Sequence, residues 1–196
     1  TQFSLDQKAY LADPWANKSR RTNPAHEQRD VPVSGSRLIV STMKDEAPYL
    51  LEWIAYHRVI GFTDFLIYTN DCSDGTDLML DRLEFLGIVT HERNNVLRRG
   101  AHKSALKYAL AHQNYRDAEW VFVADADEFL NVKIGDRQVG NLISANSDAD
   151  VIPVTWRMFA AAPQAALDAR LVIEQLTECQ SASPRENEKG RFVKSL

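Results

Sequence analysis

The chain has 196 residues, a formal net charge of −4 and 44% hydrophobic residues, enough apolar material for one buried core. The acidic balance gives no basic field for nucleic acid, and no apolar run approaches the roughly 20 residues of a membrane-spanning helix. Cys72 and Cys179 are too few and too far apart to indicate a disulfide framework or a zinc site. These properties favour a soluble, cytoplasmic protein, with a peripheral position on a membrane as the alternative.

Residues 1–36 differ in composition from the rest. They contain Pro14, Pro24 and Pro32, several basic residues and no sustained hydrophobic period, so we expect an N-terminal arm or linker. An oligomerisation arm, or the end of an upstream domain, is the alternative. At the other end, residues 191–196 look like a strand that is cut short, which predicts a fragment or processed product. The remaining residues, 37–196, are expected to form one domain, truncated at its C-terminus.

From Arg37 onward, predicted strands and helices alternate. Strands are expected at residues 38–40, 65–68, 88–89 and 120–124, and helices at 48–60, 78–86 and 101–111. Gly61 and Gly87 end the first two helices. Crossover connections of this length are right-handed, so the pattern predicts an α/β fold with a doubly wound, mostly parallel sheet flanked by helices.

Polar residues follow every predicted strand. In chain order the four groups are Thr42, Lys44, Asp45 and Glu46; Asn70, Asp71, Ser73 and Asp74; Glu92, Arg93, Arg98 and Arg99; and Asp125, Asp127 and Glu128. Because the carboxyl ends of parallel strands meet at one edge of a sheet, we expect these groups to share one site. The alternative is the ordinary polarity of loops.

The most informative of these groups begins at Asp125, where the apolar run 120–124 stops at three acids within four residues. The run predicts a strand that is buried on both faces. In extended backbone, Asp125 and Asp127 would point to the same side. Paired carboxylates suit Mg²⁺ or Mn²⁺, which commonly bridge to phosphate groups. A helix cap or a solvated turn is the alternative reading of these acids.

Three motifs, in this order, resemble those of GT-A-fold glycosyltransferases of families 2 and 92. They are TMKDEAPYLLEW at residues 42–53, NDCSDGT at residues 70–76 and DADEFL at residues 125–130. A further match, at residues 156–159 and 172–174, lies in the region that usually shapes the acceptor side. The resemblance covers about residues 37–196 and implies a GT-A-like, Rossmann-like domain.

The resemblance also implies a function. It is that of a metal-dependent, inverting glycosyltransferase of the hexosyltransferase type, which moves a sugar from a nucleotide diphosphate donor such as a UDP-sugar to an acceptor hydroxyl. The implied nucleotide-sugar site consists of Thr42, Lys44, Glu46, Asp71, Arg98, Lys103, Asp125 and Trp156. Asp127, together with Asp125, would bind Mn²⁺ or Mg²⁺. The acceptor, whether glycan, lipid or protein, is left open, and Trp156 would either stack on a sugar or close the core.

One departure from the family pattern concerns the general base. Residues 160–164 carry no titratable side chain, which leaves Glu174 and Asp168 as candidates, each with a structural role as the alternative. The missing base favours a rival function, a non-catalytic module that binds a sugar nucleotide or glycan. A haloacid-dehalogenase-type phosphatase also uses an Asp-x-Asp motif, with the first aspartate as nucleophile, but the lysine and acid pair it needs downstream are not found.

Overall fold

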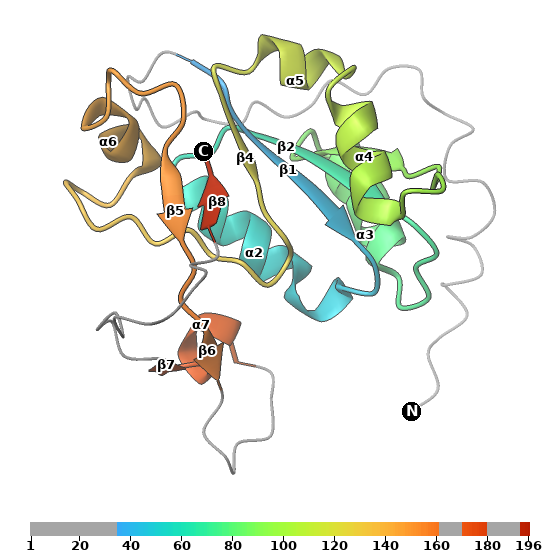
Figure 1. Cartoon of the computed structure of the whole chain (residues 1–196). Coiled ribbons are helices and arrows are strands. Elements are labelled where there is room, and N and C mark those ends of the chain that lie inside the picture. The colour runs from blue at the N-terminus through green and yellow to red at the C-terminus, as the bar shows by residue number, and fades with distance from the viewer. Residues whose placement is uncertain (1–34, 161–169, 180–192) are drawn as a thin grey trace. The chain divides into compact units, whose positions relative to one another are not determined.

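The structure is a computed structural model in which residues 35–160, 170–179 and 193–196 are described (Figure 1). Nearly all of the predicted arm at residues 1–36 lies outside the described residues. The same is true of the candidate base Asp168.

The centre of the domain is a four-stranded, all-parallel sheet with the strand order β3-β2-β1-β4. Its strands are β1 (Arg37–Met43), β2 (Asp64–Thr69), β3 (Thr90–Arg93) and β4 (Trp120–Val123). The predicted fold class is therefore confirmed. The third strand starts at Thr90 and not at Ile88, because the Ile88 N–H still bonds to the carbonyl of Leu83 at the end of the preceding helix.

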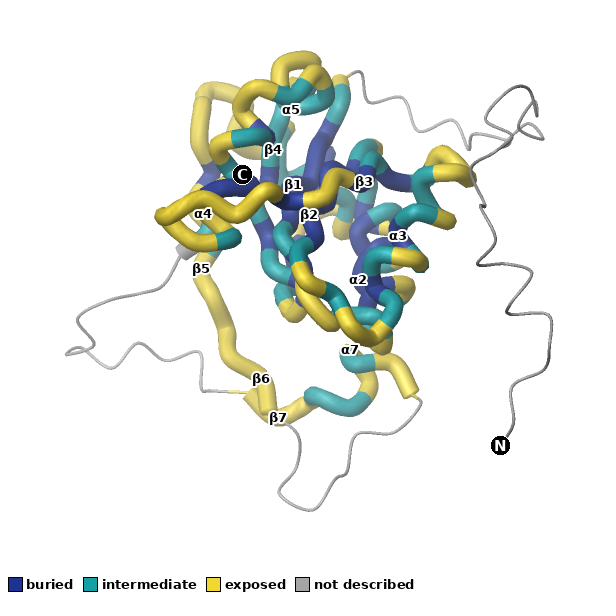
Figure 2. The backbone as a smooth tube through the Cα atoms, turned by 90° about the vertical axis from the view of Figure 1, so that its right-hand side faces the viewer, coloured by how far each residue is buried: buried dark blue, intermediate teal, exposed yellow. Residues whose placement is uncertain are grey.

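Helices cover both faces of the sheet. They are α2 (Ala47–Val59), α3 (Thr76–Phe85), α4 (Ala101–Ala109) and α5 (Gln113–Asp117). Alternate residues of β1 point to opposite faces, so Ile39 packs in a core with Trp53 of α2, whereas Leu38 packs with Ala105 and Ala109 of α4. Figure 2 shows the resulting buried strands between partly exposed helices.

Strand β4 is less buried than its apolar sequence predicts. Phe122 is buried, but Trp120, Val121 and Val123 are only partly so. The reason is position, since β4 is the last strand in the order of the sheet and, among the described strands, pairs with β1 alone. The run of apolar residues therefore predicts the strand correctly, and each face of β4 packs against a core, but of its four residues Phe122 alone is fully buried.

The C-terminal part adds α6 (Val139–Ser144), β5 (Pro153–Thr155), β6 (Phe159–Ala160), α7 (Val172–Gln175), β7 (Glu178–Cys179) and β8 (Val193–Ser195). Two antiparallel pairs form here, β5 with β8 and β6 with β7. Leu196, directly after β8, exchanges two backbone hydrogen bonds with Ile152 and is buried in the main core. Among the helices in the described part of the chain, none is both long and apolar enough to cross a membrane.

Candidate functional site

The loops that follow β1 and β2 are tied into one unit at the carboxyl edge of the sheet. Oδ1 of Asp45 accepts a hydrogen bond of 2.6 Å from the backbone N–H of Ser73, and Oδ2 of Asp74 accepts one of 2.9 Å from that of Ala47. Asp45 and Asp71 both have positive φ, 58° and 50°, a region that aspartate tolerates better than most residues. Cross-loop bonds therefore hold unusual backbone in place at the predicted site edge.

A cavity of about 460 Å³ opens at this edge. It is lined by Thr42, Met43, Lys44, Glu46, Asn70, Ala101, His102, Asp125, Ala126 and Asp127. Five of the residues implied by the resemblance are thus brought together, from the end of β1 and from the segments after β1 and β4. Asp125 and Asp127 lie in an irregular segment and turn after β4, yet both line this cavity.

His102, from the first turn of α4, is a lining residue that the sequence did not single out. A lone histidine at a helix start has no paired spacing of the kind that metal ligands show, so its own residue pattern does not mark it as a site residue. Gly100 directly before α4 is the signal that was available in the sequence, because glycine has no side chain with which to cap a helix N-terminus. The first backbone N–H groups of α4 are therefore not capped by a side chain.

A second cavity, of about 380 Å³, contains the predicted base-binding residue Asp71 and shares Asn70 with the first. Its lining consists of Thr69, Asn70, Asp71, Cys72, Asp77, Arg93, Asn94, Asn95 and Val96. Asn94 is nearly fully buried, and its Oδ1 has no hydrogen-bond partner among the described residues. A buried acceptor without a hydrogen-bond partner is costly, so the Asn94 amide is a destabilising group in the wall of this cavity.

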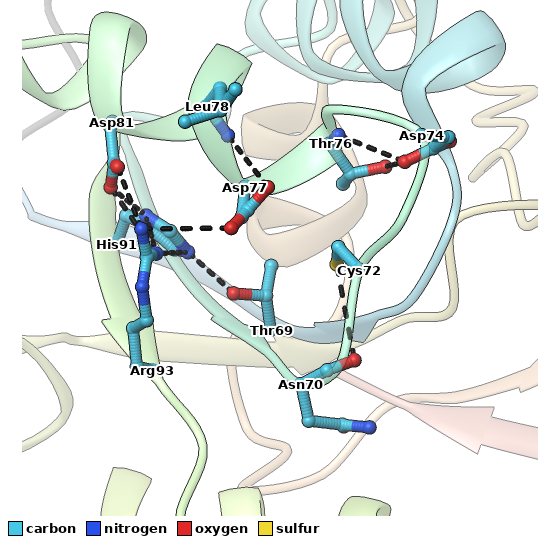
Figure 3. A network of polar contacts seen from close by, with 10 residues as sticks. All are labelled: Thr69, Asn70, Cys72, Asp74, Thr76, Asp77, Leu78, Asp81, His91 and Arg93. Atoms are coloured by element: carbon cyan, nitrogen blue, oxygen red, sulfur yellow. Dashed lines mark hydrogen bonds and ion pairs between the residues drawn. The ribbon is translucent and has the colours of Figure 1, made fainter. Parts of the chain in front are cut away.

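The wall of this second cavity is held by a polar network between α3 and β3 (Figure 3). The His91 side chain is buried, with Nε2 2.7 Å from Oγ1 of Thr69 and Nδ1 2.7 Å from Oδ1 of Asp81. Arg93 Nη2 lies 2.8 Å from Oδ2 of Asp81 and 3.7 Å from Oδ2 of Asp77. Because Thr69, Asp77 and Arg93 also line the cavity, the network orients polar groups that a ligand would meet.

The first cavity is electrostatically negative. Burial raises the pKa of Glu46, and the nearby carboxylates of Asp127, Asp74, Asp45 and Asp125 raise it further. In the described part of the chain, no three His, Cys, Asp or Glu side chains gather as a metal cage. Mg²⁺, however, is commonly held by one or two carboxylates and completed by substrate phosphates and water. The carboxylates of Asp125 and Asp127 therefore fit a metal ion that is shared with a phosphorylated ligand.

Lys194 is a second residue that the sequence did not single out. Its Nζ lies 3.1 Å from Oδ2 of Asp125 and 3.2 Å from Oε2 of Glu128, so an ammonium from β8 meets two acids of the Asp-x-Asp region. Lys194 Nζ also lies 5.7 Å from the ring centroid of Trp156. Trp156, 40% exposed, is thereby placed beside the acidic edge and not deep in the core.

The other predicted site residues in the described ranges line neither of the two cavities. Arg98 and Lys103 are exposed and flank the start of α4, next to the lining residue His102. Glu174 is exposed on α7.

The chain resembles several known proteins. Crystal structures of S. aureus TarS that match it include these two: that of residues 1–349 in complex with UDP has a TM-score of 0.47 and 11% identity, covering 68% of this chain and 38% of that one. The other has a TM-score of 0.44 and 12% identity, covering 58% of this chain and 19% of that one. A glycosyltransferase family 92 protein of Oryza sativa subsp. japonica is 32% identical over 100 residues, which are 49% of this chain and 16% of that protein.

This chain is thus aligned with only a small part of the rice protein's length. The family comparison covers far more of the chain, since the sequence model of glycosyltransferase family 92 matches residues 40–194. That range includes all three motifs and both cavities at the sheet edge. The chain therefore belongs to glycosyltransferase family 92.

Proposed function

We propose that this chain forms the donor-binding domain of a metal-dependent, inverting glycosyltransferase of the hexosyltransferase type, with a UDP-sugar as donor. The observation that carries the proposal is the 460 Å³ cavity, where Asp125 and Asp127 lie with Thr42, Lys44 and Glu46 at the carboxyl edge of a parallel sheet. Acids and a lysine in one cavity suit a metal-bound diphosphate better than an uncharged ligand.

In this proposal the smaller cavity binds the base of the donor and the larger cavity binds its diphosphate. Asp71 and the amide of Asn95 in the smaller cavity offer a carboxylate, an acceptor and donors to the polar edge of a pyrimidine base. Lys44, His102 and the start of α4 in the larger cavity suit the diphosphate, because the first N–H groups of a helix and its dipole favour anions. Arg98 and Lys103, exposed next to this helix start, add positive charge at its rim.

The metal would be held mainly by Asp127, with Asp125 directed to the ribose or to the metal. When bound, it would supply positive charge to the departing nucleoside diphosphate. The acceptor oxygen forms a bond to the anomeric carbon as the bond from that carbon to the diphosphate oxygen breaks, with inversion at the carbon. The proton of the acceptor hydroxyl must go to a base, for which Glu174 and Asp168 are the candidates.

Calorimetric titration with UDP, with and without Mn²⁺, tests the proposal. We expect Mn²⁺ to strengthen UDP binding to the wild type by about tenfold or more, and Asp127→Asn to remove that gain, because a charge-assisted metal contact is lost. Asp136→Asn, which changes an exposed aspartate outside both cavities, is the matched control and should behave as wild type.

UDP binding that is indifferent to both Mn²⁺ and Asp127→Asn would contradict the metal-diphosphate arrangement. Turnover of a panel of sugar nucleotides, each offered with simple acceptors, then distinguishes a transferase from a binding module. Metal-dependent UDP binding without turnover of any donor would favour the non-catalytic sugar-nucleotide module.

A further inference from the structure

Strand β8 delivers Lys194 to the acidic edge as a fixed part of the fold. Lys194 is paired with Val154 of β5 in an antiparallel register. Two residues further on, Leu196 is buried in the main core and exchanges backbone hydrogen bonds of 2.8 and 3.0 Å with Ile152. Because the backbone on both sides of Lys194 is held, the position of its ammonium is set by tertiary structure and not by a freely moving tail.

The ammonium of Lys194 forms ion pairs with two carboxylates, those of Asp125 and Glu128. Its Nζ is within 3.1 Å of Asp125 Oδ2 and 3.2 Å of Glu128 Oε2, and the backbone N–H of Asp125 donates a 3.0 Å hydrogen bond to the same Glu128 oxygen. The side chains of Lys194 and Glu128 are each 18% exposed and that of Asp125 is 43% exposed, so water screens the Lys194–Glu128 contact less than the Lys194–Asp125 contact. Two acids and one base leave a net charge of −1 on the three side chains.

Asp127 differs from Asp125 in this respect. It lines the same cavity, but it is exposed and forms no hydrogen bond or ion pair within the described part of the chain. Asp125 has one carboxylate oxygen already committed to an ammonium, and a divalent cation placed on that oxygen would be repelled by Lys194 at short range. The two aspartates of the motif are therefore unequal as metal ligands.

We propose that Lys194 is a positioning residue that ion-pairs Asp125 away from the metal, so that Asp127 is the principal carboxylate ligand and a divalent cation binds tightly only together with the diphosphate. This inference rests on the proposed function, and it assigns to Asp125 a role in orienting the site. Removal of the Lys194 charge then acts in opposite directions on two ligands. The acidic edge becomes more negative, which favours a free metal ion and disfavours a free nucleotide anion.

The test compares Lys194→Met, Lys194→Arg and the matched control Lys107→Met, which removes a lysine charge at an exposed position of α4. Three quantities are measured for each: the affinity for Mn²⁺ alone, from the free Mn²⁺ signal in electron paramagnetic resonance; the affinity for UDP alone; and thermal unfolding. For Lys194→Met we expect Mn²⁺ affinity to rise and metal-free UDP affinity to fall, each by about tenfold for one unit charge at short range. Lys194→Arg and Lys107→Met should both stay close to wild type.

The opposite signs separate an electrostatic role from a structural one. The inference would be overturned if Lys194→Met lowered the affinities for both Mn²⁺ and UDP. It would also be overturned if the variant kept its fold and lowered neither of these affinities. Failure of every variant and the wild type to bind UDP would instead overturn the proposed function. The Mn²⁺ measurement needs no nucleotide, so it decides on the charge of Lys194 in that case too.

Discussion

Trp53 of α2 donates a hydrogen bond of 2.9 Å from its indole Nε1 to the backbone carbonyl of Glu128, 75 positions along the chain. Two further side chains of the same helix bind the backbone nearby. The Tyr56 hydroxyl donates to the carbonyl of Leu130 at 3.0 Å, and Nε2 of His57 accepts from the Leu130 N–H at 3.4 Å. Helix α2 therefore holds the segment that directly follows the two aspartates of the motif.

The hydroxyl of Tyr56 offers a one-atom test of this contact. Tyr56→Phe should lower the free energy of unfolding by about 0.5–1.5 kcal/mol, because the partly buried Leu130 carbonyl loses its donor. Tyr49→Phe removes the same atom from the same helix, where the hydroxyl has no partner among the described residues, and should change stability by less than about 0.5 kcal/mol. Urea denaturation measures both, and equal effects of the two substitutions would contradict the contact's role.

A pH dependence follows from the burial of His57. Burial lowers the pKa of this imidazole from 6.5 to about 4, and the hydrogen bond to the Trp53 carbonyl acts in the opposite direction. Between these two pH values the unfolded chain binds the proton more readily than the folded one. Stability present above pH 6.5 is therefore lost as the pH falls toward 4, by at most about 3 kcal/mol from this residue.

Urea denaturation at a series of pH values measures this loss. Carboxylates also titrate in the window, so the informative quantity is the difference between wild type and His57→Gln. We expect the variant to be less stable at pH 7 but to lose stability less steeply on acidification. Parallel pH profiles for the two proteins would show that His57 is not the group responsible.

The network at the smaller cavity predicts unequal effects for two aspartates of α3. Asp81 pairs with both His91 and Arg93 at short distances, whereas Asp77 lies 3.7 Å from Arg93. Asp81→Asn should cost about 1–3 kcal/mol of stability because it weakens the hydrogen bond of a buried imidazole. Asp77→Asn should cost less than about 1 kcal/mol, as is usual for exposed pairs. Chemical denaturation at pH 7 compares them, and a larger loss for Asp77→Asn would argue against this order.

Glu52 of α2 links the main domain to α7. Its two carboxylate oxygens accept hydrogen bonds from the backbone N–H groups of Val172 and Ile173, at 2.6 and 3.1 Å. In Glu52→Ala these two amides should exchange with solvent about tenfold faster or more, because a short helix that loses its N-terminal acceptors opens more often. Glu52→Gln keeps one good acceptor oxygen, so the exchange rates of the two amides should lie between those of the wild type and those of Glu52→Ala. Unchanged exchange in Glu52→Ala would mean that other contacts hold α7.

Most of the sheet was predictable because its signals are local. Runs such as 65–68, bounded by turn residues, predict strands, and the helical spacing between them predicts crossovers. Burial was less predictable, as β4 shows, since the place of a strand in the sheet is not written in its own residues. The start of β3 was misplaced for a similar reason, because the end of α3 uses the backbone of Ile88.

The candidate site also has features that the sequence predicts and features that depend on the tertiary structure. By itself the sequence determined that polar residues after four parallel strands, Asp125 and Asp127 among them, meet at one edge, because strand direction and crossover hand follow from short-range stereochemistry. Only tertiary structure decided that Lys194 pairs with Asp125 across 69 positions, and that His102 lines the cavity while Lys103 does not. Such contacts depend on how separately folded segments pack and on which way each side chain points, and no local pattern encodes either.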